Sequence, residues 1–179
     1  MVKRFYTSVT TGQTEAGYFV ALDAHRLKTP AKRDLDLPTQ ALAIALAEEW
    51  EAQDEEILPA AMPIMRLVAT AVDRVGDALD ATVASFVEYA GSDMLLYRAE
   101  TPAKLVQHQE ENWSPILAWA QKRFDLAFNV TNGVLPVDQP AGNAARLTKI
   151  AGWEVFRVSG LAHGAALLGS AILTLALEA

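Results

Sequence analysis

The apolar residues of the chain change their spacing near Pro38, and this change constrains the fold more than any other feature. Before it, the pattern is strand-like: Phe5, Thr7 and Val9 alternate with Tyr6, Ser8 and Thr10, and residues 18–22 are rich in β-prone side chains. After it, apolar residues recur about every 3.6 positions, as on one face of a helix. The sequence therefore predicts an α+β fold, with a small antiparallel β domain over residues 1–38 and a larger helical domain over 39–179.

Turn residues separate the short strands that are expected in the β domain. Gly12 and Gly17 indicate a turn between the first two strands, and residues 23–26 can reverse the chain before the third. The expected strands cover residues 5–10, 18–22, 27–29 and 35–37.

Breaker residues divide the helical domain into successive helices. Thr39 suits the N-cap of the first helix, Pro59 ends it, and Pro63 suits the first turn of the next. Gly91 is suited to end the third helix, and Pro115 is expected to kink or restart the fourth. The expected helices cover about 39–58, 63–75, 79–91, 102–124, 142–157 and 159–177, with a short strand over 128–130.

The segment 158–177 has no formal charge over twenty residues and contains the GxxxG spacing Gly160–Gly164, so it could be interpreted as a membrane span. The flanking sequence is evidence against a membrane span, because the preceding helices are amphipathic and no basic cluster flanks the segment. We therefore expect a buried helix and no membrane partner, with His163 as a core or near-core residue.

Six carboxylates in the nine residues 48–56 account for −6 of the formal net charge of −7. Trp50 lies inside this acidic run, and helical spacing places it on the same side as Leu42 and Leu46. We expect its indole to anchor the helix to the core. The exposed acids around it, with Trp50 at their centre, predict a surface for a partner protein, formed by Glu48, Trp50, Glu51 and Glu55.

The first 33 residues are basic, with six Lys and Arg residues against Glu15 and Asp23, a net charge of +4. Because no aromatic residues alternate with these bases, they are interpreted as solvated strand faces rather than a phosphate site. The pI of about 4.9 also argues against nucleic acid, which binds through clustered Lys and Arg. No apolar segment follows the N-terminus, so no secretory signal is predicted.

The sequence offers no constellation for catalysis. It lacks cysteine, which excludes disulfides, thiolate metal sites and cysteine nucleophiles. Its three histidines fall in different expected elements, and no nucleophile elbow, P-loop or dinucleotide-binding glycine pattern occurs. We therefore expect a protein that is not an enzyme and has no cofactor.

One spacing leaves an alternative open. His108 and Glu111 lie one helical turn apart, beside Glu110, which could contribute to a metal- or ligand-binding site in a helical protein. Two ligands are a weak signal for a metal. A solvated polar face explains the same residues, and this interpretation is favoured.

A second pair of acids, Glu88 and Asp93, flanks residues 89–92 near the expected end of a helix. Such residues more often cap a helix, pair with a base, here Arg98 or Arg66, or join two domains than contact a partner. They remain candidates for partner binding.

Phrases spread along nearly the whole chain resemble the assembly chaperones of the F-type ATP synthase that bind the alpha subunit of its catalytic head. The phrases are Lys3-Arg4-Phe5-Tyr6, Leu22-Asp23, Lys28-Thr29-Pro30, Leu37-Pro38-Thr39, Glu49-Trp50-Glu51-Ala52-Gln53, Met62-Pro63, Asp73-Arg74-Val75, Tyr89-Ala90-Gly91-Ser92-Asp93-Met94-Leu95, Tyr97-Arg98-Ala99, Trp113-Ser114-Pro115 and Gln139-Pro140. Each phrase alone is weak, but their order and spacing are specific.

This resemblance implies a β domain followed by a helical domain, and a role without catalysis. Members of the family hold the free alpha subunit, shield the apolar surface that its beta neighbour later covers, and release it during hexamer assembly. The resemblance also implies a location in the bacterial cytoplasm, or in the mitochondrial matrix of a eukaryote. We expect the free chaperone to be a monomer. A generic adaptor with another partner is the remaining alternative.

The chain departs from the family pattern at several positions. Ala24-His25 stands in place of a glycine turn, Ala69 in place of an asparagine, and Leu96 in place of a cysteine. The family generally continues beyond the position of Ala179 through an acidic, tryptophan-bearing helical tail. If this tail belongs to the family's binding surface, a chain that ends at Ala179 is expected to be a truncated form that binds more weakly.

Overall fold

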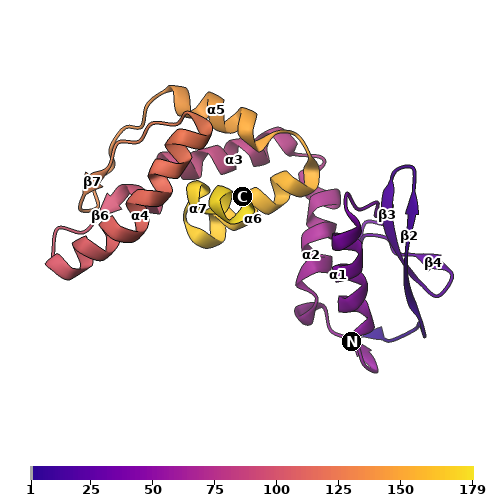
Figure 1. Cartoon of the computed structure of the whole chain (residues 1–179). Helices are drawn as coiled ribbons and strands as arrows, with labels where there is room; N and C mark the ends of the chain where they lie inside the picture. The colour runs from indigo at the N-terminus through magenta and orange to yellow at the C-terminus, as the bar shows by residue number, and fades with distance from the viewer. Residues whose placement is uncertain (1) are drawn as a thin grey trace. The chain divides into compact units, whose positions relative to one another are not determined.

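The computed structural model describes residues 2–179 and contains two compact units, one up to Ala78 and the other from Leu79 (Figure 1). The first unit contains, in chain order, β1 (Val2–Lys3), β2 (Val9–Thr14), β3 (Gly17–Leu22), β4 (His25–Arg26), α1 (Gln40–Glu51), β5 (Glu56–Ile57), a 3-10 turn (Pro59–Ala61), α2 (Pro63–Thr70) and a π-helical segment (Ala71–Val75). The second contains α3 (Leu79–Gly91), a 3-10 turn (Met94–Leu96), β6 (Tyr97–Arg98), α4 (Ala103–Phe124), β7 (Thr131–Asn132), α5 (Gly142–Ala151), α6 (Val155–Leu168) and α7 (Ala171–Glu178).

The antiparallel β region predicted at the N-terminus is confirmed. Strands β2, β3 and β4 are hydrogen-bonded in that order, and β1 pairs with β5. In the β2–β3 hairpin Thr14 lies opposite Gly17, so Glu15 and Ala16 form the turn. Gly12, which was expected in the turn, lies instead within β2, where an added Cβ would meet the ring of Phe19. The strand expected over 35–37 is reduced to a bridge between Leu37 and Tyr18.

Helix α1 begins and packs as its sequence predicts. The Thr39 hydroxyl accepts a hydrogen bond from the Leu42 amide, which is the predicted N-cap. Its buried residues are Ala43, Leu46 and Trp50, and the helix packs against β2, β3 and α2. The apolar face of α1 is therefore covered by the sheet and by α2.

The division between the units differs from the boundary expected at residue 38. The change of apolar period marks the point where strands give way to helices, but α1 and α2 share their core with the sheet. An amphipathic helix must bury its apolar stripe against a neighbouring element, and the sheet provides the nearest apolar face. The structure therefore places the division between Ala78 and Leu79.

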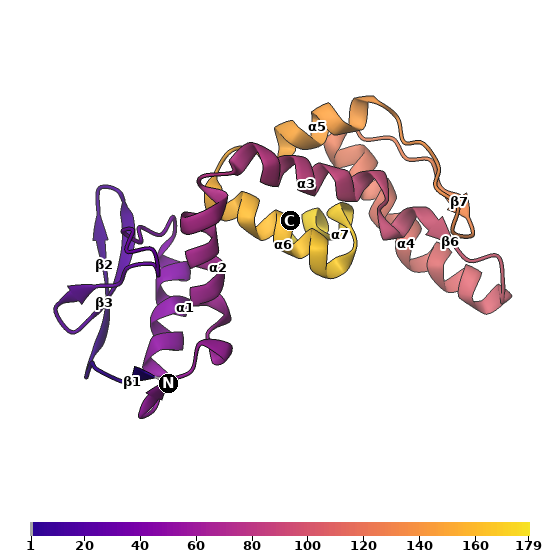
Figure 2. The ribbon, with the colours of Figure 1, turned by 180° about the vertical axis from the view of Figure 1, so that it is seen from behind.

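The second unit is helical, with β6 and β7 as a short parallel pair. Helix α3 packs against α5, α6 and α7, and α4 packs against α7. Figure 2 shows this unit from behind, with α6 and α7 below α3. Its fully buried side chains include Phe86, Leu95, Leu96, Leu147, Val158, Ile172 and Leu175.

The end of the chain differs from the single helix expected over 159–177. Helix α6 ends at Leu168, Gly169 adopts a left-handed conformation with φ 62°, and the Ser170 hydroxyl accepts a hydrogen bond from the Leu173 amide to start α7. His163, which was expected in or near the core, is exposed. Within residues 2–179, no helix is long and apolar enough to cross a membrane.

Two further helical predictions need correction. Helix α4 runs through Pro115 as one element over Ala103–Phe124, so the structure excludes the restart that was one of the two expected effects of this proline. The helix expected over 142–157 ends at Ala151, and α6 begins after Glu154, whose carboxylate accepts hydrogen bonds from the amides of Phe156 and Arg157. The strand expected over 128–130 lies slightly later, at β7.

Candidate functional site

Trp50 holds the end of α1 in the core of the first unit, as its helical phase predicts. Its side chain is only 8% exposed. The ring of Tyr6 packs edge-on against it, with 5.7 Å between ring centroids, and the Tyr6 hydroxyl donates a 2.6 Å hydrogen bond to the Trp50 carbonyl. Burial raises the pKa of Tyr6. Trp50 therefore fixes the position of the acidic residues that surround it.

The acidic run 48–56 divides into structural and exposed carboxylates. Glu49 is half-buried, and its carboxylate accepts hydrogen bonds of 2.8 and 2.7 Å from the amides of Ile64 and Met65. These amides lie in the first turn of α2, so the Glu49 carboxylate caps that helix. Its negative charge also interacts favourably with the positive end of the helix dipole. Glu56 lies in β5 opposite Lys3. The Glu49 carboxylate therefore joins the end of α1 to the start of α2.

Glu48 and Glu51 are exposed and line a shallow cleft of about 340 Å³ between α1 and β2. This acidic cleft is lined by Val9, Thr11, Ile44, Ala47, Glu48 and Glu51. Ile44 is an exposed large apolar residue. The cleft therefore combines apolar side chains with two exposed carboxylates.

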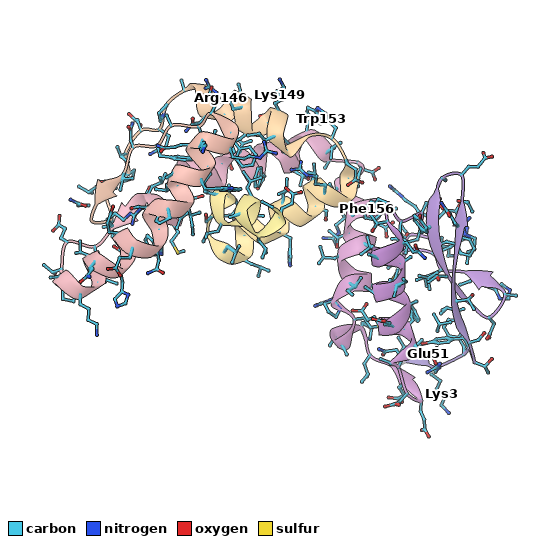
Figure 3. All side chains as sticks on the ribbon, viewed as in Figure 1. Lys3, Glu51, Arg146, Lys149, Trp153 and Phe156 are labelled. Atoms are coloured by element: carbon cyan, nitrogen blue, oxygen red, sulfur yellow. The ribbon has the colours of Figure 1, made fainter. Side chains whose placement is uncertain are left out.

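Arg4 connects Glu51 with the exposed Glu55. Its guanidinium lies 3.3 Å from the Glu51 carboxylate and donates to the backbone carbonyls of Glu51 and Gln53, while its amide donates to the Glu55 carbonyl at 2.9 Å. Figure 3 shows Glu51 at the same end of the first unit as Lys3. The structure thus brings Glu48, Glu51 and Glu55 to one region of the first unit.

Glu88 and Asp93 lie in the second unit, and only Glu88 is exposed. The prediction that Asp93 offers a surface to a partner needs correction, because Asp93 is 0% exposed. Its carboxylate accepts hydrogen bonds from the amides of Leu95 at 3.1 Å and Ile172 at 3.0 Å. Burial raises the pKa of Asp93, although these bonds oppose that shift. Asp93 therefore joins the end of α3 to the start of α7.

The alternative site around His108 and Glu111 lacks the geometry of a metal centre. Both residues are exposed on α4, and the Glu111 carboxylate accepts a 2.8 Å hydrogen bond from the Gln107 amide group. In the part of the chain that the structure describes, no group of three or more His, Cys, Asp or Glu side chains could hold a metal ion. These residues form a polar face of α4.

Several apolar side chains that were not predicted to be exposed lie on the surface of the second unit. Trp153 is 57% exposed in the turn between α5 and α6 (Figure 3), and Val134 and Leu135 are exposed in the segment after β7. Val134 and Leu135 lie in the irregular segment 126–140, so their exposure could have been predicted from the sequence. Trp153 gave no such signal, because most tryptophans are largely buried.

Comparisons with known proteins identify the family. Residues 3–121 match the family model described as ATP12 chaperone protein. The crystal structure of Atp12 from Paracoccus denitrificans is 40% identical to this chain, with a TM-score of 0.91 over 98% of this chain and 76% of that chain, and a mutant of the same protein matches equally. A candidate chaperone from Agrobacterium tumefaciens is 38% identical, with a TM-score of 0.90 over 98% of this chain and 66% of that chain. The chain therefore belongs to the ATP12 chaperone family.

Proposed function

We propose that this ATP synthase assembly chaperone binds the unassembled alpha subunit of the catalytic head and keeps it from aggregating before the hexamer forms. The observation that supports this proposal is membership in the ATP12 chaperone family, with a fold shared over 98% of the chain. A chaperone family indicates a binding protein rather than an enzyme. The proposed location is the bacterial cytoplasm, or the matrix in a eukaryote, and the proposed free form is a monomer.

The acidic cleft is the proposed contact for the alpha subunit. A surface that shields apolar side chains needs an apolar centre with a polar rim. Ile44 and Val9 supply apolar area, Glu48 and Glu51 supply the rim, and Glu55 extends it. Trp50 anchors the end of α1, which carries Glu48 and Glu51, in the core. In the second unit, Glu88 is a further proposed contact.

Coexpression tests the proposed partner directly. The alpha subunit of the source organism is produced alone and together with this chain, and the soluble alpha subunit and the copurified complex are measured. We expect the chaperone to raise the soluble fraction and to copurify with it. No gain in soluble alpha subunit together with no complex would contradict the proposal.

A charge-neutralised variant tests the proposed contact. Glu48→Gln, Glu51→Gln and Glu55→Gln together remove three exposed charges, while the side-chain amide oxygen introduced at position 51 would still accept the bond from Arg4. We expect unchanged thermal stability and weaker capture of the alpha subunit, because charges at an interface favour binding chiefly through complementarity.

The matched control replaces three exposed glutamates of the second unit with glutamine in the same way, at Glu100, Glu110 and Glu111. It changes the net charge by the same amount and includes the residues of the alternative ligand site. This control should capture the alpha subunit like the wild type. Equal loss in both variants would mean that net charge, not the acidic cleft, governs capture.

A further inference from the structure

A second concave surface lies in the first unit and has the opposite charge. It is a groove of about 740 Å³ lined by residues of β4 and the chain after it, the end of α1, β5 and α2. Its apolar floor consists of Leu22, Leu27, Trp50, Ile57, Met62 and Ala69, all buried. The volume is in the range of sites that bind a small molecule or several side chains.

The mouth of this basic groove is also apolar. Phe5 lines it and is 69% exposed, and Met65 lines it and is half-buried. Methionine is flexible and polarizable, so Met62 and Met65 can adapt to different apolar side chains. The indole N–H of Trp50 is buried and lacks a hydrogen-bond partner among the described residues. An exposed phenylalanine at an apolar groove is typical of a surface that a partner covers.

The charged lining of the groove is mainly basic: Arg26, Lys28, Arg66 and Arg74 stand against Asp73. Asp73 is already engaged, because its carboxylate accepts hydrogen bonds from the Thr29 hydroxyl at 2.6 Å and the Ala31 amide at 3.2 Å. With four bases against one acid, the lining of the groove carries a net positive charge that would attract an acidic partner.

Two of the bases have no acidic partner within the described chain. Arg26 pairs with Asp36 at 2.5 Å and Lys28 with Asp34 at 2.9 Å. No ion pair joins Arg66 or Arg74 to any residue that the structure describes. These two arginines are thus free to bind carboxylates from outside.

We propose that the basic groove binds an apolar segment of the partner polypeptide that carries carboxylates. The apolar floor would take its side chains, and Arg66 and Arg74 would pair with its acids. This inference rests on the proposed function, because it takes the alpha subunit as the partner.

The spacing of the two arginines constrains the segment. They lie eight positions apart along α2 and the π-helical segment, a rise of at most about 12 Å at the α-helical 1.5 Å per residue. Carboxylates about four residues apart on an extended segment, or about eight apart on a helix, span this distance. The partner segment should therefore show acids at one of these spacings with apolar residues between them.

Charge reversal at the rim tests the proposal. Arg66→Glu with Arg74→Glu is compared with Lys104→Glu and Lys149→Glu, two exposed lysines of the second unit (Figure 3 shows Lys149), so the net-charge change is the same. We expect the groove variant to lower capture of the alpha subunit about tenfold, more at low salt than at high salt, and the control to keep it. Circular dichroism should show that both variants keep the fold.

Photocrosslinking identifies the occupant. With p-benzoylphenylalanine in place of Phe5, irradiation of the complex should join the groove to an alpha-subunit segment with the predicted acid spacing, and the Arg66→Glu, Arg74→Glu change should remove the crosslink. Failure of the wild type to capture the alpha subunit would contradict the proposed function itself. Capture by the wild type and the groove variant alike would overturn only the groove proposal. The groove proposal would also be overturned if dodecanoate bound to the wild type but not to the groove variant, while both proteins captured the alpha subunit equally.

Discussion

Asp23 shows how one exposed residue can tie two strands together. It adopts a left-handed conformation with φ 52° after β3, and one carboxylate oxygen accepts hydrogen bonds from the amides and hydroxyls of Thr7 and Ser8. These bonds, chiefly those from the backbone amides, lower the pKa of Asp23 from 3.8 to about 2. The folded state therefore favours the ionised carboxylate.

The lowered pKa of Asp23 predicts that the free energy of unfolding depends on pH in the acidic range. Because the pKa of Asp23 is lower in the folded than in the unfolded state, its contribution is fully present above about pH 4 and is lost as the pH falls through about 2. Asp23→Asn should lower the free energy of unfolding near neutral pH, and its difference from wild type should shrink below pH 4. Urea unfolding at a series of pH values measures it. A difference that stays constant with pH would contradict the assignment.

Asp93 differs from Asp23, because its carboxylate is buried and accepts hydrogen bonds inside the second unit. Asp93→Ala leaves the amides of Leu95 and Ile172 buried without an acceptor, so it should lower the free energy of unfolding by roughly 2–4 kcal/mol. Glu88→Ala, on the exposed face of α3, should change it by less than about 0.5 kcal/mol. Urea denaturation compares the two. Equal effects would mean that Asp93 does not join α3 to α7.

At the scale of the helix, α1 buries Trp50 and leaves Glu48 and Glu51, two residues of the proposed contact, exposed. Trp50→Ala removes a buried aromatic ring and should cost about 3–5 kcal/mol of stability. The triple Gln variant of Glu48, Glu51 and Glu55 should leave the melting temperature nearly unchanged and weaken partner capture. Thermal unfolding and copurification, measured on both variants, check this division. The reversed pattern would overturn it.

Local signals predicted where helices begin but not everything that follows. Thr39 and Pro63 start α1 and α2 as expected, because a cap depends on a few neighbouring residues. The break at Gly169 and Ser170 was missed, since both α6 and α7 bury apolar faces and the apolar run continues across them. Periodicity does not reveal a break when the helices on both sides are buried.

The candidate site was predictable to the same limited degree. Helical phase alone placed Trp50 in the core and left Glu48 and Glu51 outside. The burial of Asp93 depends on Ile172, which is distant in sequence, and no local pattern indicates it. The basic groove was missed for the same reason, since Leu22, Trp50 and Met65 come from separate elements.

At the scale of the whole molecule, the basic and the acidic segments of the sequence line two different surfaces of the first unit. The basic N-terminal segment supplies Arg26 and Lys28 to the basic groove, and the acidic run supplies Glu48 and Glu51 to the acidic cleft. A partner that engaged both surfaces would be oriented by their opposite charges. The chain's overall net charge of −7 hides this separation.

The same unit should fold without the rest of the chain. The sheet, α1 and α2 bury Val20, Leu37, Leu46 and Met62 among themselves, and the chain divides after Ala78. Domains of about 60 residues or more can bury enough apolar surface to fold alone. A fragment of residues 1–78 should therefore unfold cooperatively on heating and give dispersed amide resonances. A fragment of residues 1–38, the domain expected from the change of apolar period, should do neither, because it lacks the helices that cover the sheet. If 1–38 folded alone, the boundary near Pro38 would be restored and α1 would be an accessory to the β domain rather than part of its core.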